Sequence, residues 1–204
     1  MRLIVITPEN NITGEHQIVN ALLERGLFRI HVRKPAFDTA AYREYLQNID
    51  PAHWAKVTVH GGFELYGELS LGGIHLNVAA RQDAKIAKLI QPPESRAISA
   101  SLHSWQEVEE LNTLYHYVFI SPLFDSISKK GYLAATPVQE IHDLRKKAAI
   151  SGANLPLIIG LGGVCRTNIG ELKENGYDGA ALLGAIWNAK DPLAEYDNIA
   201  SLIK

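Results

Sequence analysis

Short runs of apolar, often β-branched residues recur along the chain, and segments with helical spacing of apolar residues separate them. The runs are continuous rather than alternating in polarity, which is typical of parallel strands covered on both faces. They predict strands at residues 3–6, 28–32, 56–59, 72–76, 96–100, 115–120, 156–160 and 179–183. The pattern therefore predicts an α/β protein with a parallel sheet.

The intervening segments predict helices at residues 15–25, 39–48, 63–67, 84–90, 166–175 and 191–202. Two further helices are expected to open at Ser104 and Thr136, because each residue begins a capping-box pattern. Eight strand–helix units without a domain-sized break favour a single (β/α)8 TIM barrel over an open doubly wound sheet. We therefore expect one barrel domain over residues 1–204.

Composition narrows the class of partner. The 204 residues carry a formal net charge of −2, which gives no reason to expect nucleic acid or an anionic membrane. The N-terminal residues lack the features of a signal peptide, and the single cysteine, Cys165, fits a reducing compartment. We expect a cytoplasmic protein that binds small-molecule phosphates, with a homo-oligomer left open.

The segment from Val118 to Tyr132 contains the most specific local chemistry. A predicted strand stops at Ser121-Pro122, and a loop then gathers hydroxyl and ammonium groups, including those of Ser126, Ser128 and Lys129. Such groups suit a phosphate or pyrophosphate. The alternative is an ordinary solvated loop.

Glycines follow the last two predicted strands. Gly162 and Gly163 come after the seventh, and Gly184 with Ala185 after the eighth. In (β/α)8 barrels the main-chain amides of these turns commonly bind phosphate, because no Cβ blocks the approach. The alternative is that the glycines serve only to form tight turns.

Titratable side chains cluster at other predicted strand ends. Arg33 and Lys34 follow the second strand and suit a diphosphate, or else form a solvated pair. Four histidines lie near consecutive strand ends: His31, His60, His75 and His103. Three of them could ligate a metal, or they could donate to phosphate, act as general acids or be structural.

These positions resemble the thiamine phosphate synthase and thiazole tautomerase superfamily, a family of small (β/α)8 barrels. The motifs that carry the resemblance are His31-Val32-Arg33-Lys34, Gly73-Ile74-His75-Leu76, Ser101-Leu102-His103-Ser104, Ser121-Pro122-Leu123-Phe124-Asp125-Ser126-Ile127-Ser128-Lys129 and Gly162-Gly163-Val164, followed by the stretch from Gly179. The motif after the sixth strand is the most specific, and the resemblance covers nearly the whole chain.

The resemblance implies a transferase that joins a hydroxymethylpyrimidine diphosphate to a thiazole phosphate and releases pyrophosphate. It implies that Arg33, Lys129, Ser101 and Mg2+ hold the diphosphate, with Ser126 and Ser128 where the family has threonines. Gly163 and Gly184 would face the thiazole phosphate. The other residues that we expect to bind substrate are His31, Lys34, His60, His75, His103, Gly162 and Ala185.

One departure concerns the metal. His60-Gly61 and Ala80 stand where the family's synthases have aspartates that bind Mg2+, so the ligands of a Mg2+ ion are not identified. One hypothesis is that cationic imidazoles replace the metal. Two other functions stay open: a metal-independent thiazole phosphate isomerase, and a non-catalytic binder of a phosphate ligand.

Overall fold

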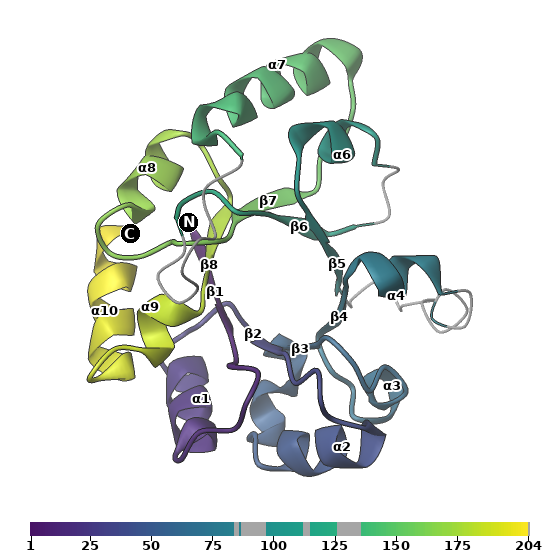
Figure 1. The fold of residues 1–204 in the computed structure, drawn as a ribbon, viewed down its shortest axis with the longest axis vertical. Helices are drawn as coiled ribbons and strands as arrows, with labels where there is room; N and C mark the ends of the chain where they lie inside the picture. The colour runs from purple at the N-terminus through teal and green to yellow at the C-terminus, as the bar shows by residue number, and fades with distance from the viewer. Residues whose placement is uncertain (84–85, 87–96, 112–114, 126–135, 204) are drawn as a thin grey trace. The chain divides into compact units, whose positions relative to one another are not determined.

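The computed structural model describes residues 1–83, 86, 97–111, 115–125 and 136–203 (Figure 1). Eight strands form a closed barrel in sequence order, which confirms the predicted (β/α)8 architecture. The strands are β1 (Arg2–Ile6), β2 (Arg29–Val32), β3 (Val57–Val59), β4 (Gly73–Leu76), β5 (Ala97–Leu102), β6 (Tyr117–Ile120), β7 (Leu157–Gly160) and β8 (Gly179–Leu182).

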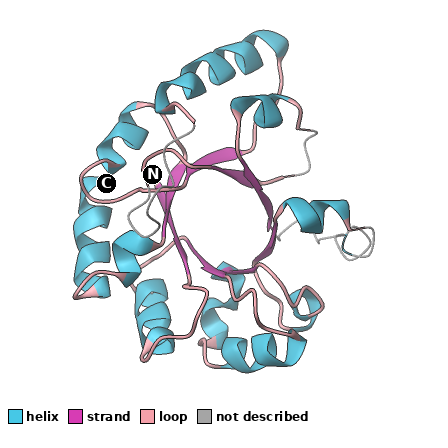
Figure 2. Ribbon diagram, viewed as in Figure 1, coloured by secondary structure: helices cyan, strands magenta, loops and turns pink. Residues whose placement is uncertain are grey.

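The chain divides into two compact units, and the boundaries fall within β1 and β5. The N-terminal unit comprises Ile4–Ser99, and the C-terminal unit comprises Met1–Leu3 with Ala100–Lys204. Within each unit the helices lie on the outer side of the strands (Figure 2). That residues 1–204 behave as one domain stays a prediction.

In the N-terminal unit β1, β2, β3 and β4 pair successively in parallel. Their apolar residues are buried, as the continuous runs predicted. Gly26 ends the first helix at a φ of +87°, and its N–H donates to the carbonyl of Leu23. The helices are α1 (Glu15–Glu24), α2 (Thr39–Gln47), the 3-10 helix η1 (Pro51–Lys56), α3 (Leu65–Glu68) and α4 (Val78–Gln82).

In the C-terminal unit β6, β7 and β8 pair in parallel. Ser104 caps its helix as predicted, because its side chain accepts from the N–H of Glu107. Asp191 also caps a helix, and its side chain accepts from the N–H groups of Leu193 and Ala194. The helices are α6 (Trp105–Glu109), the 3-10 helix η2 (Val138–Glu140), α7 (Ile141–Ser151), α8 (Ile169–Glu174), α9 (Gly184–Trp187) and α10 (Pro192–Leu202).

Two helix starts differ from the expectation. Thr136 does not cap a helix, because its hydroxyl donates to the carbonyl of His103 instead. The helix after β4 begins at Val78, where Asn77 caps it by accepting from the N–H of Ala80 at 2.8 Å. Most of the helix predicted at 84–90 lies outside the described residues.

None of the helices in the described part of the chain combines the length and the apolarity that crossing a membrane requires.

Candidate active site

Three imidazoles meet at the carboxyl ends of β2, β3 and β4. His31 lies in β2 and His75 in β4, and His60 directly follows β3. The main-chain N–H of His60 donates to the carbonyl of Val32, which extends the β2–β3 pairing to this level. His31 Nδ1 lies 2.9 Å from His60 Nε2, and the rings of His60 and His75 stack with centroids 4.3 Å apart. Three of the four strand-end histidines therefore form one cluster.

A serine on β5 holds the ring of His75. The hydroxyl of Ser99 donates to the carbonyl of Ile74 at 3.2 Å, and its oxygen lies 2.9 Å from His75 Nδ1. A hydroxyl has a single proton, so the Ser99 oxygen accepts from Nδ1–H. His75 is thus held in the tautomer whose lone pair lies on Nε2.

The histidine cluster is uncharged at neutral pH. Burial disfavours the imidazolium and lowers the pKa of His31 and His60 well below the ordinary value. It also lowers the pKa of His75 to about 3, and the charges of Arg33 and Arg81 act in the same direction. These three rings are therefore neutral where the hypothesis that cationic imidazoles replace a metal needs them charged.

Arg33 follows β2 and is partly exposed. Its guanidinium lies 2.6 Å from Glu9 Oε1, and its main-chain N–H donates to the hydroxyl of Thr7 at 2.9 Å. The side chains of Arg33 and Glu9 are 38% and 45% exposed. Such an ion pair contributes roughly 0–1 kcal/mol to stability. The guanidinium can therefore exchange Glu9 for an anionic ligand at little cost.

Lys34 occupies a different environment. The residue is fully buried, and its Nζ lies 2.8 Å from Glu15 Oε1 and donates to the carbonyl of Asn10. The hydroxyl of Tyr45 donates to the same carboxylate at 2.5 Å. The Lys34 ammonium thus links the end of β2 to α1 and to the segment before α1. It is paired there and is not exposed to a ligand.

Glu15 was not predicted from the sequence as the partner of Lys34. A signal was present, because Glu15 precedes the buried Val19 and Leu22 by four and seven residues and so belongs to the buried face of α1. An acidic residue on an apolar helix face indicates a buried cation.

The positions that correspond to the family's Mg2+ aspartates hold no carboxylate. At Gly61 a Cβ would lie 3.0 to 3.2 Å from two ring carbons and the hydroxyl oxygen of Tyr42, and the main-chain N–H of Lys34 donates to that hydroxyl. Ala80 lies in the first turn of α4. The donors gathered here are imidazole nitrogens, whereas Mg2+ prefers oxygen. The described residues therefore do not fit a Mg2+ site.

In the C-terminal unit His103 and Ser121 are joined directly. His103 Nδ1 lies 3.0 Å from the carbonyl oxygen of Ser121, and because a carbonyl only accepts, the proton is on Nδ1. The side chain of His103 is exposed. Ser101 lies in β5 and is partly exposed. Ser126, Ser128 and Lys129 lie outside the described residues.

The glycines after β7 are needed for the close approach of two main chains. Gly162 and Gly163 have φ of +92° and +65°. A Cβ on Gly163 would lie 2.3 Å from the carbonyl oxygen of Asp125, and the N–H of Phe124 donates to the carbonyl of Gly162. Protein backbone, rather than an anion, thus lies where the Gly163 side chain would be. Phosphate binding by the amides of this turn stays a prediction.

The turn after β8 adjoins the turn after β7, because these strands pair in parallel. Gly184 opens the short helix α9 directly after β8, and Ala185 follows it. This arrangement matches the usual phosphate position of (β/α)8 barrels.

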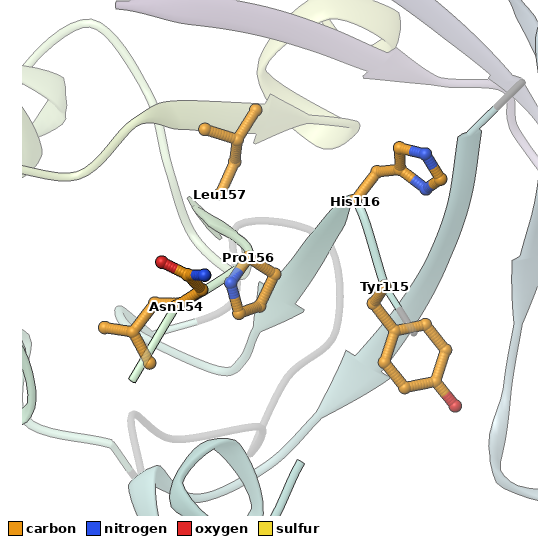
Figure 3. Close-up of a pocket in the computed structure, with 6 residues that line it drawn as sticks. Tyr115, His116, Asn154, Pro156 and Leu157 are labelled. Atoms are coloured by element: carbon orange, nitrogen blue, oxygen red, sulfur yellow. The ribbon is translucent and has the colours of Figure 1, made fainter. Parts of the chain in front are cut away.

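A separate hollow of about 270 Å³ lies at the amino ends of β6 and β7 (Figure 3). In (β/α)8 enzymes the active site is found at the carboxyl ends of the strands, so this hollow is not part of the candidate site. Its walls are formed by Tyr115, His116, Asn154, Leu155, Pro156 and Leu157.

Known proteins resemble this chain over most of its length. A thiamine-phosphate synthase from Listeria welshimeri is 31% identical over 127 residues, which cover 61% of this chain and 57% of that protein. One from Vibrio campbellii is 22% identical over 208 residues, covering 100% of this chain and 98% of that protein. The crystal structure of a thiamine phosphate pyrophosphorylase from Bacteroides thetaiotaomicron superposes with a TM-score of 0.77 at 28% identity, covering 99% and 97% of the two chains.

The match to the family described as thiamine monophosphate synthase runs from residue 3 to residue 186. This span includes every strand of the barrel and both turns that follow β7 and β8. The resemblance inferred from the strand-end motifs is thereby confirmed. This chain belongs to the thiamine monophosphate synthase family.

Proposed function

We propose that this protein is a thiamine phosphate synthase, which transfers a pyrimidine methylene group to a thiazole phosphate and releases pyrophosphate. The family match over residues 3–186 is the observation that carries the proposal. The names of the relatives from Listeria, Vibrio and Bacteroides support it.

The proposed reaction is dissociative. The bond between the pyrimidine methylene carbon and the diphosphate oxygen breaks first and leaves a carbocation. The thiazole nitrogen then attacks this carbon to form the carbon–nitrogen bond, and the pyrophosphate formed in the first step is released from the site. Since negative charge develops on the leaving group, catalysis consists mainly of stabilising the diphosphate with fixed positive charges and hydrogen-bond donors.

We propose that Arg33 contacts the diphosphate. Its ion pair with Glu9 is exposed and weak, so a more highly charged anion competes for the guanidinium. By family resemblance Lys129 and Ser101 also contact the diphosphate, with the hydroxyls of Ser126 and Ser128. We leave Lys34 out of this set, because its ammonium is buried against Glu15.

We further propose that main-chain amides of Gly163 and Gly184 bind the thiazole phosphate. The adjacency of the turns after β7 and β8 supports this placement. By family resemblance Mg2+ accompanies the diphosphate. The described residues offer it no carboxylate set, so we derive no catalytic step through it.

Two other functions were open from the sequence. An isomerase acting on a thiazole phosphate is not favoured by the family match, and neither is a non-catalytic phosphate binder. An assay of pyrophosphate release distinguishes the synthase from the isomerase and from the non-catalytic binder. We expect release when both substrates are present and not with either one alone. An isomerase or a binder would release no pyrophosphate under any of these conditions.

Replacing Lys129 by alanine is expected to weaken binding of the pyrimidine diphosphate more than binding of the thiazole phosphate, because the lost charge acts mainly on the more anionic ligand. Loss of one charge-assisted contact costs roughly 1.5–3 kcal/mol. Isothermal titration with each ligand measures this, and Lys173→Ala, on the surface of α8, is the control. Equal losses for the two ligands would show that Lys129 does not contact the diphosphate.

A further inference from the structure

We propose that His31, His60 and His75 form a binding site for a divalent transition-metal ion of the Zn2+ or Co2+ class. One potential ligand nitrogen from each of the three side chains lies within 4.8 Å of the other two. In the described part of the chain no other group of three or more histidine, cysteine or acidic side chains is gathered in this way. The inference does not rest on the proposed synthase activity.

The spacing of the three nitrogens is close to that of a tetrahedral site. With metal–nitrogen bonds of about 2.0–2.1 Å, two ligand nitrogens lie about 3.4 Å apart. His31 Nδ1 and His60 Nε2, at 2.9 Å, must separate slightly to admit an ion. The widest nitrogen pair, at up to 4.8 Å, must close. Reaching this geometry requires the rings of His60 and His75, which stack in this structure, to rotate about their side-chain bonds.

The surroundings of His75 resemble those of histidines that ligate metals. Such histidines usually donate their second ring N–H to an oxygen, which fixes the tautomer and aims the other nitrogen at the ion. The Ser99 oxygen accepts from His75 Nδ1–H, and the serine is itself fixed by its bond to the carbonyl of Ile74. Ser99 is therefore a positioning residue for the Nε2 of His75.

The charges around the cluster favour an anion as the fourth ligand. His60 is only partly buried, whereas His31 and His75 are almost fully covered, so the cluster is reached from the side of His60. The guanidinium groups of Arg33 and Arg81 act electrostatically on His75. Their charge disfavours a bare dication and favours one that also holds an anionic oxygen. We therefore expect pyrophosphate to strengthen metal binding.

Titration of the metal-free full chain with Co2+ tests this site. We expect one ion per chain, with the strong visible absorption of four-coordinate Co2+, displacement by Zn2+ and no displacement by Mg2+. Pyrophosphate should lower the dissociation constant and shift the spectrum. His60→Gln should weaken binding at least 100-fold, and Ser99→Ala by roughly 10- to 100-fold, as for other residues that orient a ligand.

His142→Asn is the matched control, since this exposed histidine on α7 bonds to Asn175 and lies outside the cluster. It should bind Co2+ as the parent does. Thermal unfolding checks that each variant is folded, and His60→Gln is the decisive one because its side chain is the least buried of the three. A parent that binds no Co2+, or a folded His60→Gln variant that binds Co2+ as tightly as the parent, would overturn the proposal and leave the cluster as a neutral hydrogen-bonded network.

Discussion

Replacing Lys34 by methionine is expected to lower the free energy of unfolding by about 3–5 kcal/mol, the range for removing one partner of a buried ion pair. The ammonium of Lys34 is fully buried, and it neutralises a carboxylate that is itself only 2% exposed. Without the Lys34 ammonium, the Glu15 carboxylate keeps its hydrogen bonds from the Tyr45 hydroxyl and from the main-chain N–H of Ile12, but it has no neighbouring cation. Denaturant unfolding of the variant measures the loss.

Two controls sharpen this prediction. The double variant Glu15→Gln with Lys34→Met should be more stable than Lys34→Met alone, because no unpaired charge remains. Lys147→Met removes an ion pair with Glu109 whose lysine is 66% exposed, and it should cost far less, because solvent screens an exposed pair. A Lys34→Met variant as stable as Lys147→Met would contradict the assignment of Lys34 to a buried pair and would return it to the diphosphate set.

Acidification from pH 7 to pH 5 in metal-free buffer is expected to destabilise the protein by about 2 kcal/mol through His75, with a further loss through His31. The folded-state pKa of each lies below the ordinary value of about 6.5. Below pH 6.5 the unfolded chain therefore binds protons that the folded chain does not, and stability falls with pH until the folded-state pKa is reached. For His75, whose folded-state pKa is about 3, this amounts to about 2 kcal/mol at pH 5.

The window between pH 7 and pH 5 isolates the histidines, because carboxylates with lowered pKa values, such as that of Glu68, act only in more acidic solution. His60 adds a loss of the same sign, since its pKa is also lowered. Urea unfolding at several pH values measures the slope. A free energy of unfolding that stays constant over this window would show that the three imidazoles are not buried in neutral form.

Much of the fold could be predicted from the sequence because each parallel strand is an uninterrupted apolar run. The start of α4 could not, because Asn77 follows a strand directly and its role as a helix cap depends on the backbone turning there. Thr136 has the residue pattern of a cap, but its hydroxyl reaches His103 instead. The spacing of residues along the sequence does not show whether such a side chain bonds to a nearby main-chain group or to one brought close by the fold.

Individual residues of the candidate site could be predicted from the sequence, but the contacts between them could not. The sequence placed histidines at strand ends, but their convergence depends on strand register and on the direction of each ring. Lys34 shows the same limit, because a lysine beside an arginine suggests solvent or an anion unless the position of Glu15 is known. For Gly163 the sequence shows only that a glycine stands there, and not that the Asp125 carbonyl lies where a Cβ would be.

The most direct test of the central claim follows the carbon–nitrogen bond that a synthase must form. The protein is incubated with a hydroxymethylpyrimidine diphosphate labelled at the methylene carbon, together with the thiazole phosphate, and the products are identified by mass. The proposed function predicts labelled thiamine phosphate and pyrophosphate in equal amounts. Recovery of both substrates unchanged, or of a rearranged thiazole phosphate with the labelled diphosphate intact, would contradict it.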